Sequence, residues 1–272
     1  MTKTTSQAIA GTRSRQLPIF DRSRSRLRIP IEILPEALRQ ANGEGLASPV
    51  ATVKLETGGV ITDGDLHPSA AQLLQVIASA SMMVAVDVQY DGDSSVTTIW
   101  ATPSRAVVTS TLDAELVDIE PVRVARLPET LSDVILLGRP EVTADHPITA
   151  STLVVANAER FTDQPERARR ALEAGGICPD DIERLLAFQS PTSRRWRISS
   201  TWATDAGQQI AELRGIDSGV HGQWLMEMRG DGSRDSELVF TPQDDGAILR
   251  ALRGVLPRYW IGTALNPNAV KV

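Results

Sequence analysis

Residues 82–101 read MMVAVDVQYDGDSSVTTIWA, and this stretch decides the fold class. Apolar side chains recur at every second position from Met82 to Val88, which is the spacing of a strand with one buried face. Asp91-Gly92-Asp93 interrupts the run with residues that favour a tight turn, and an apolar run resumes from Val96 to Ala101. The stretch therefore predicts an antiparallel β-hairpin.

Elements on both sides extend this hairpin into a larger module. Pro68 at a first helical position begins a helix that runs through Ile77. Two more strands are expected at Arg105–Leu112 and Glu115–Ile119, and a helix begins at Leu127 and carries apolar residues to Leu137. The order is thus helix, four strands, helix, and such a meander is antiparallel.

The same order of elements returns about 111 residues later, although the side chains match poorly. A helix is expected to begin at Pro179, and another to follow Thr241 as its N-cap with Pro242 at its first position. Between these helices lie the four expected strands, at Arg194–Trp202, Gln209–Gly215, Trp224–Met228 and Ser236–Phe240. We therefore predict an α+β fold, in which two β-meander units form one central antiparallel sheet with a pseudo-twofold axis, covered by helices.

The remaining body is less regular. Ile29 to Leu38 could hold a short strand and a helix, and Val50 to Leu55 alternates weakly, as a strand would. Residues 146–176 read as a helical insert with helices at Ser151–Ala158 and Gln164–Ala174. We expect a single α+β domain, with residues 29–140 as its N-terminal half and residues 141–272 as its C-terminal half including a helical bundle.

Residues 1–28 differ in composition from the rest of the chain. They carry seven Lys and Arg residues against the single acid Asp21, whereas the whole chain of 272 residues has a net charge of −6. The segment is rich in Ser and Thr and has little to bury, so we predict a disordered basic arm that is dispensable for folding. The acidic body argues against a nucleic-acid-binding core.

Composition also excludes several classes of protein. No apolar run approaches the roughly 18 to 20 residues of a membrane-spanning helix. The one cysteine, Cys178, allows no intrachain disulfide and no multi-cysteine cluster, and a reducing compartment such as the cytoplasm fits. The three histidines, His67, His146 and His221, are widely spaced and supply a metal site poorly. We expect no metal and no cofactor.

Catalytic motifs are absent from the sequence, which indicates that the protein is not an enzyme. Asp91-Gly92-Asp93 lacks the other ligands of a calcium loop and reads as a hairpin turn. Cys178 precedes a helix, a position that can activate a thiol, but a structural thiol is the simpler interpretation. Two sets of side chains have a structural and a binding interpretation. Trp196, Trp202 and Trp224 are core residues or an aromatic binding face, and Arg194, Arg195 and Arg197 are the polar side of a strand or an anion site.

A resemblance to a known protein family covers roughly residues 29–261. The blocks that carry it are His146 to Ala158, Leu172 to Asp181, Ile182 to Phe188 with Ser190-Pro191, Arg194 to Trp202, Glu237 to Pro242, Ala247 to Pro257 and, in the first half, Gly59 to Pro68. With these blocks the chain resembles the EspG family, the chaperones associated with ESX (type VII) secretion in mycobacteria and related actinobacteria. The resemblance implies a central antiparallel sheet with quasi-twofold symmetry and two helical bundles.

The resemblance also implies a function and a site. Family members are cytosolic adaptors that bind PE–PPE heterodimers by the tip of the PPE helical domain, keep them soluble and route them to an ESX machine. Their binding surface uses the loop between the second and third strands, which corresponds here to Asp91, Gly92, Asp93, Ser94 and Ser95. It also uses a C-terminal bundle, which corresponds to helices at Gln164–Ala174, Ile182–Phe188 and Ile248–Leu256. We also expect this loop, with its two acids, to be longer than a two-residue hairpin turn requires.

Two other function classes stay open at this point. One is an enzyme with a diffuse active site on an α+β scaffold, which would show a deep pocket with convergent ionisable groups. The other is a DNA-associated regulator that uses the basic arm, which would bind DNA with steep salt dependence. The sequence identifies neither the PE–PPE substrate nor the ESX system, and it leaves the oligomeric state unknown.

Overall fold

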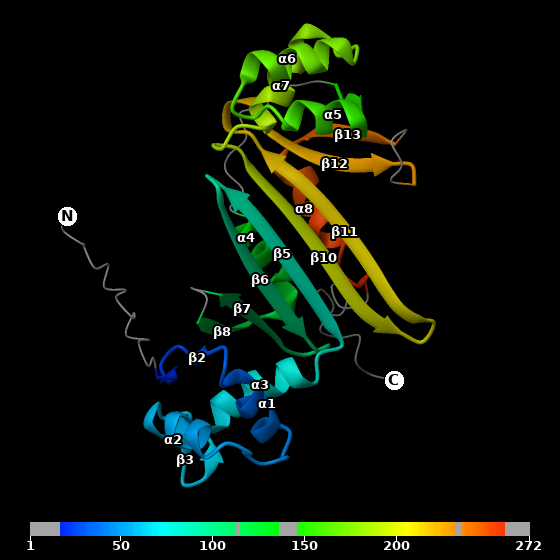
Figure 1. Cartoon of the computed structure of the whole chain (residues 1–272). Helices are drawn as coiled ribbons and strands as arrows, with labels where there is room; N and C mark the ends of the chain where they lie inside the picture. Colours follow the sequence, from blue (N-terminus) through cyan, green and yellow to red (C-terminus); the bar gives the residue numbers. More distant parts are fainter. Residues whose placement is uncertain (1–16, 112–114, 136–145, 232–235, 259–272) are drawn as a thin grey trace, which may run out of the picture.

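The computed structural model describes residues 17–111, 115–135, 146–231 and 236–258, and its main feature is a long antiparallel sheet (Figure 1). Eleven strands pair in the order β1-β2-β8-β7-β6-β5-β10-β11-β12-β13-β9. Their bounds are β1 Ile19–Asp21, β2 Arg26–Pro30, β5 Met82–Tyr90, β6 Asp93–Ala101, β7 Ala106–Thr111, β8 Leu116–Val122, β9 Ile148–Ser151, β10 Arg194–Thr204, β11 Gly207–Asp217, β12 Gln223–Arg229 and β13 Glu237–Gln243. A separate small hairpin pairs β3 (Ile61–Thr62) with β4 (Asp65–Leu66).

The strand order has the symmetry of a duplication. The first long strands of the two meanders, β5 and β10, pair antiparallel at the centre of the sheet. Outward from this pair the order is β6, β7, β8, β2 on one side and β11, β12, β13, β9 on the other. Antiparallel pairing of two equivalent strands is the arrangement that a twofold axis between them produces. The predicted α+β class and the two meander units in one sheet are confirmed.

The helices fall into two bundles and one central pair. Near one end of the sheet lie α1 (Leu34–Ala41), α2 (Pro49–Thr57) and α3 (Pro68–Ala78), and near the other lie α5 (Thr152–Glu159), α6 (Pro165–Ala174) and α7 (Pro179–Phe188) (Figure 1). The pair α4 (Leu127–Val134) and α8 (Asp245–Gly254) packs on the centre. Short 3-10 turns occur at Val124–Arg126 and Gly219–His221.

The core alternates between the two faces of the sheet. Ala106 packs in the central cluster with α4 and α8, while its neighbour Val107 packs with the α1–α3 bundle. Because successive side chains of a strand point to opposite faces, the bundle lies on the face opposite the central pair. Three apolar clusters therefore stabilise the molecule, one under each bundle and one under α4 and α8.

The duplicated unit is longer than the one predicted. Strand β9 and helices α5 and α6 occupy the segment predicted as a helical insert, and they precede α7 as β2, α1 and α2 precede α3. Residues 146–176 are therefore not an insertion but the counterpart of the first strand and helices. The strand Ile148–Ser151 was not predicted, because four residues are too few to show a periodicity.

Two local predictions are wrong for reasons of capping. Residues 50–55 belong to helix α2, whose N-cap Ser48 accepts a hydrogen bond from the Ala51 N–H at 3.3 Å and whose first residue is Pro49. These start signals override a weak alternation. Thr241 and Pro242 lie in β13, and the N-cap of α8 is instead Asp244, which accepts from the Ala247 N–H at 2.6 Å.

The basic arm is the largest correction. Residues 1–16 lie outside the described residues, but residues 17–28 contribute β1 and most of β2 to the sheet. Leu27 is fully buried, whereas Arg26 and Arg28 hold the buried carboxylate of Asp118 on β8 at 2.6 and 3.0 Å. Arg26 and Arg28 alternate with buried residues and thus form the polar face of a strand. They are not part of a solvated tail.

The carboxyl group of Asp118 is adapted to this position. Burial alone would raise its pKa, but hydrogen bonds from Arg28 and Arg26 outweigh that effect and hold the pKa below its ordinary value. The ionised side chain therefore ties β2 to β8.

None of the helices in the described part of the chain has the length and apolar character needed to span a bilayer.

Candidate partner-binding groove

The central strands run between the two bundles, and one face of the sheet is turned toward the bundles (Figure 1). On β5, Val84, Val86 and Val88 pack toward α4 and α8, so Asp87 and Gln89 point to the opposite face. Arg195 and Arg197 of β10 stand beside them, because they are their register partners. Where this face meets α5 and α7, it forms a candidate partner-binding surface.

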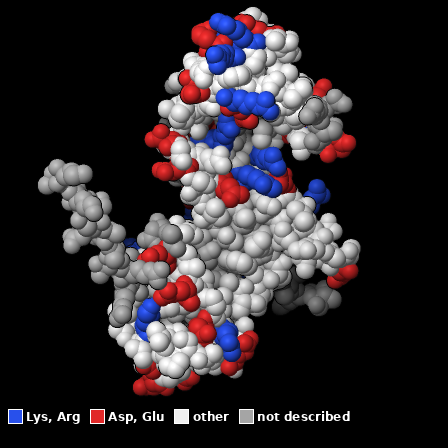
Figure 2. Space-filling model, in the orientation of Figure 1, with Lys and Arg blue, Asp and Glu red and all other residues white. Residues whose placement is uncertain are grey.

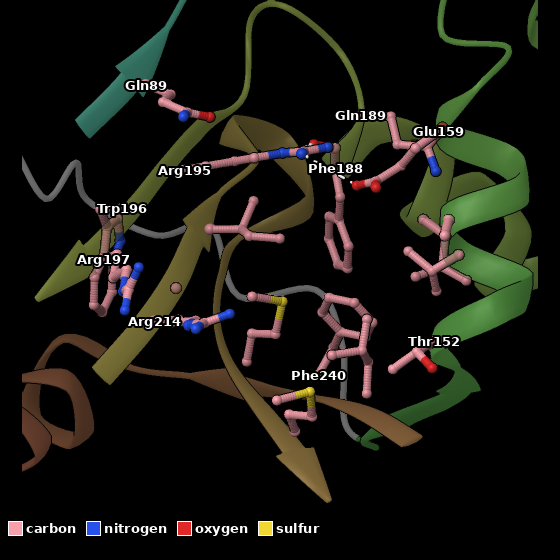
Figure 3. A pocket seen from close by; sticks show the side chains of 18 of the residues that line it. Gln89, Thr152, Glu159, Phe188, Gln189, Arg195, Trp196, Arg197, Arg214 and Phe240 are labelled. Carbon is pink, nitrogen blue, oxygen red and sulfur yellow. Dashed lines mark hydrogen bonds and ion pairs between the residues drawn. The ribbon is translucent and has the colours of Figure 1, made fainter. Parts of the chain in front are cut away.

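A groove of about 660 Å³ lies at this junction. Its walls come from α5, α7 and the strands β5, β6 and β10 to β13. Apolar side chains make up its floor: Val155, Leu185, Phe188, Ile216, Met226 and Phe240. Figure 3 shows Phe188 and Phe240 of this floor between the strands and α5. Gln189, Arg195 and Glu159 form one polar end. The groove therefore combines an apolar surface with a few placed polar groups, as binding sites do.

Packed aromatic rings support the floor. The ring of Phe188, at the end of α7, lies 5.1 Å from Trp224 in an edge-on arrangement and 5.3 Å from Phe240. Trp224 is fully buried, and its indole N–H donates to the His221 carbonyl at 2.8 Å. Trp196 is also buried, so both tryptophans are core residues. This agrees with the structural interpretation of the tryptophans and not with an aromatic binding face. Such locked rings hold the floor in one shape.

Ion pairs arrange the charged residues near the groove. The carboxylate of Glu212 on β11 accepts from Arg197 at 2.6 Å and also from Arg214. Partial burial would raise the pKa of Glu212, but the hydrogen bonds from Arg197 and Arg214 prevail and lower it. Arg195 contacts Glu159 of α5 at 3.2 Å. Figure 2 accordingly shows charges of both signs interspersed in the upper half of the molecule, and a mostly uncharged central face below.

The five residues predicted at the hairpin separate into two groups. Asp91 and Gly92 form a two-residue turn with φ of 53° and 80°, and Asp93 begins β6. The prediction of a longer loop is therefore wrong, because Asp-Gly at two positive-φ positions closes a hairpin by itself. Ser94 and Ser95 lie within β6, and of the five residues only Ser94 lines the groove. Ser95 pairs with Val88 and so faces the α4–α8 side.

The hairpin tip is nevertheless fixed to the C-terminal bundle. The Asp91 N–H donates to the carbonyl of Pro191, just after α7, at 2.9 Å. The guanidinium of Arg194 lies 4.9 Å from the centre of the Tyr90 ring on the same hairpin. The tip is thus joined to the bundle beside the groove, and all five predicted residues are exposed.

The predicted helices of the site need one correction and one addition. Helices α6 and α7 do belong to one bundle, but Ile248–Leu256 packs against α4 on the opposite face of the sheet. Helix α5, which the resemblance did not assign to the site, supplies one wall of the groove. Its contribution includes Ala156, an exposed small residue that no sequence pattern distinguishes.

Two of the other candidate residues, Cys178 and His146, lie at the start of α7, whereas His67 caps α3 and His221 lies in a 3-10 turn. The Cys178 thiol donates to Asp181 at 3.0 Å, and His146 contacts the other oxygen of that carboxylate at 3.2 Å. The same carboxylate also accepts from Arg184 at 3.0 Å, so it serves as the centre of a local polar cluster. In the residues that the structure describes, no group of three or more His, Cys, Asp or Glu side chains is placed to hold a metal ion.

Comparisons with known proteins identify a family and a similar fold. The sequence matches the model of the EspG family over residues 23–254. No curated protein sequence matches the chain. Among solved structures, that of the Mycobacterium tuberculosis type VII secretion system chaperone EspG5 in complex with a PE25–PPE41 dimer matches with a TM-score of 0.62. The match covers 85% of this chain and 97% of the other at 11% identity, so it establishes a shared fold.

Proposed function

This chain belongs to the EspG family, and on that premise we propose that it is a chaperone for PE–PPE heterodimers. In this proposal it binds a PE–PPE pair in the cytoplasm, keeps the pair soluble and delivers it to an ESX (type VII) secretion system. It acts by binding and not by catalysis. The observation that carries the proposal is the groove with an apolar floor, which lies on the fold shared with a chaperone solved with a PE–PPE dimer.

The chemistry of the groove suits the tip of a helical partner. Its floor of Phe188, Phe240 and Met226 accepts a few apolar side chains, and such groups cause aggregation when a partner leaves them exposed. A volume of about 660 Å³ holds side chains but not a whole domain. Stable interfaces bury about 1,200 to 2,000 Å² in total, so the contact would extend onto the open sheet face. Met83 and Val96 present exposed apolar side chains there.

Titration calorimetry tests the proposal directly. The chain is titrated with PE–PPE heterodimers of its own organism, and the PE25–PPE41 dimer serves as a reference. We expect one of the organism's own pairs to bind at a 1:1 ratio with a Kd between about micromolar and nanomolar, since the complex must both protect and release. Absence of binding to every pair would contradict the proposed function.

The hairpin tip offers a more specific prediction. We expect Asp91→Lys with Asp93→Lys to slow association with the PE–PPE pair about tenfold at low salt, because rim charges act mainly on encounter rates. The effect should shrink at high salt, where such charges are screened. Both side chains are exposed, so melting should change by no more than about 0.5 kcal/mol. Stopped-flow association rates at two salt concentrations measure this.

The chain contains its own control for this experiment. Asp63-Gly64-Asp65 has the same residue types at an exposed turn with positive φ at Asp63 and Gly64, but it joins β3 and β4 in the α1–α3 bundle. Asp63→Lys with Asp65→Lys changes the net charge equally and should leave the association rate near that of the wild type. Equal rates for both double variants would exclude the hairpin tip from the interface.

A further inference from the structure

One buried side-chain oxygen at the polar end of the groove has no hydrogen-bond partner among the described residues. Gln189 follows α7 directly and is only 9% exposed, yet its Oε1 atom is buried without a hydrogen bond to any described residue. The side chain lines the groove, and Figure 3 shows it beside Glu159. Buried amide groups in folded proteins are nearly always hydrogen-bonded, so an orphan at a binding surface requires an explanation.

The structural duties of this residue are met by its main chain. The Gln189 N–H donates to the Leu186 carbonyl at 3.1 Å and so ends α7. Any residue with a backbone N–H supplies that bond. The side-chain amide is thus unnecessary for the helix, and an unpaired buried amide destabilises the folded chain. Its presence is explained if the missing partner comes from outside the chain.

The neighbouring charges define what this partner group is. Glu159 already accepts from Arg195 at 3.2 Å, and Arg195 also donates to the Phe188 carbonyl at 3.1 Å. The two charges compensate each other, so the end of the groove has no excess charge to attract an ion. An unpaired acceptor oxygen in such surroundings selects an uncharged donor, such as a peptide N–H, a side-chain amide or a hydroxyl group.

We propose that Gln189 determines partner specificity by accepting a hydrogen bond from an uncharged donor on the segment that enters the groove. This inference rests on the proposed function. The segment places an apolar side chain on the floor near Phe188, and its donor reaches Gln189 at the polar end. A segment that lacks the donor leaves Gln189 buried and unpaired in the complex, and sites built to hydrogen-bond a partner discriminate strongly against such ligands.

Substitution by methionine tests this proposal because it keeps the length of the side chain and removes the hydrogen-bonding groups. We expect Gln189→Met to weaken binding of the PE–PPE heterodimer about tenfold or more, while the melting temperature of the free protein stays equal or rises. Calorimetry and thermal melting of the same preparations give both quantities.

Gln72 supplies the matched control. It is exposed on α3 in the other bundle and is not among the groove-lining residues, so Gln72→Met should change the affinity less than twofold. Equal affinities for Gln189→Met and the wild type would overturn the inference and leave the proposed function intact. A fall in both stability and affinity would show a structural role and would overturn it as well. Absence of wild-type binding would instead contradict the proposed function itself.

Discussion

Replacement of Ala156 by tryptophan is expected to weaken binding of a PE–PPE heterodimer at least a hundredfold, on the order of the loss at an interface hot spot. Ala156 is exposed on α5 and lines the groove, so an indole there fills the space that the partner's side chains would take. The folded chain has room for the ring, because the methyl group of Ala156 faces the open groove and not the core. Calorimetric titration of the purified variant measures the loss.

The next residue along the helix provides the control. Asn157 is exposed on α5 but is not among the groove-lining residues, so Asn157→Trp adds the same ring to the same helix outside the groove. It should bind within about twofold of the wild type, and both variants should melt within about 0.5 kcal/mol of it. Tight binding by Ala156→Trp would show that the partner does not enter this groove.

Removal of residues 1–28 is expected to destabilise the fold by more than about 3 kcal/mol. The truncation deletes Leu27, whose full burial makes its loss comparable to a large core truncation of about 2 to 5 kcal/mol. It also removes Arg26 and Arg28, the partners of buried Asp118, and an unpaired buried charge is costly. Because whole domains are stable by only about 5 to 15 kcal/mol, this loss is large.

Urea unfolding at several pH values measures this effect and its cause. The pKa of Asp118 in the folded chain lies below its ordinary value of 3.8, so the ionised carboxylate stabilises the fold fully above pH 3.8. This stabilisation is lost as the pH falls through the pKa of the folded chain. The stability difference between the full chain and the truncation should therefore narrow below pH 3.8. Removal of residues 1–16 alone is the control, because it deletes none of these contacts. Equal stability of the full chain and the chain without residues 1–28 would contradict the role of β2.

The sequence predicts the meanders well because their strands have one buried face. Met82 to Val88 shows the period of two without interruption, and Pro68 and Pro179 mark the start of a helix in each unit. The first strands fail for the opposite reason. In β2 the residues that alternate with Leu27 and Ile29 are arginines within a run of like charge, and composition alone assigns such a run to a tail. Their partner, Asp118, lies 90 residues away from Arg28, so no local pattern reveals the pairing.

The groove was only partly predictable from sequence. The resemblance placed the hairpin and the C-terminal bundle together, and the bond from Asp91 to Pro191 joins them in the structure. The floor was missed because Phe188, Met226 and Phe240 come from three separate elements, and each has the signature of an ordinary core residue. Gln189 was the one available signal, as a polar residue directly after the apolar end of α7.

Hydrogen exchange of the chain with and without a bound PE–PPE heterodimer tests the central claim most directly. We predict that complex formation slows exchange in α5, at the end of α7 around Gln189 and in the β5–β6 hairpin, while α1 to α3 exchange as in the free chain. Protection confined to the α1–α3 bundle, in a complex shown to be saturated, would contradict the assignment of the groove as the partner-binding site.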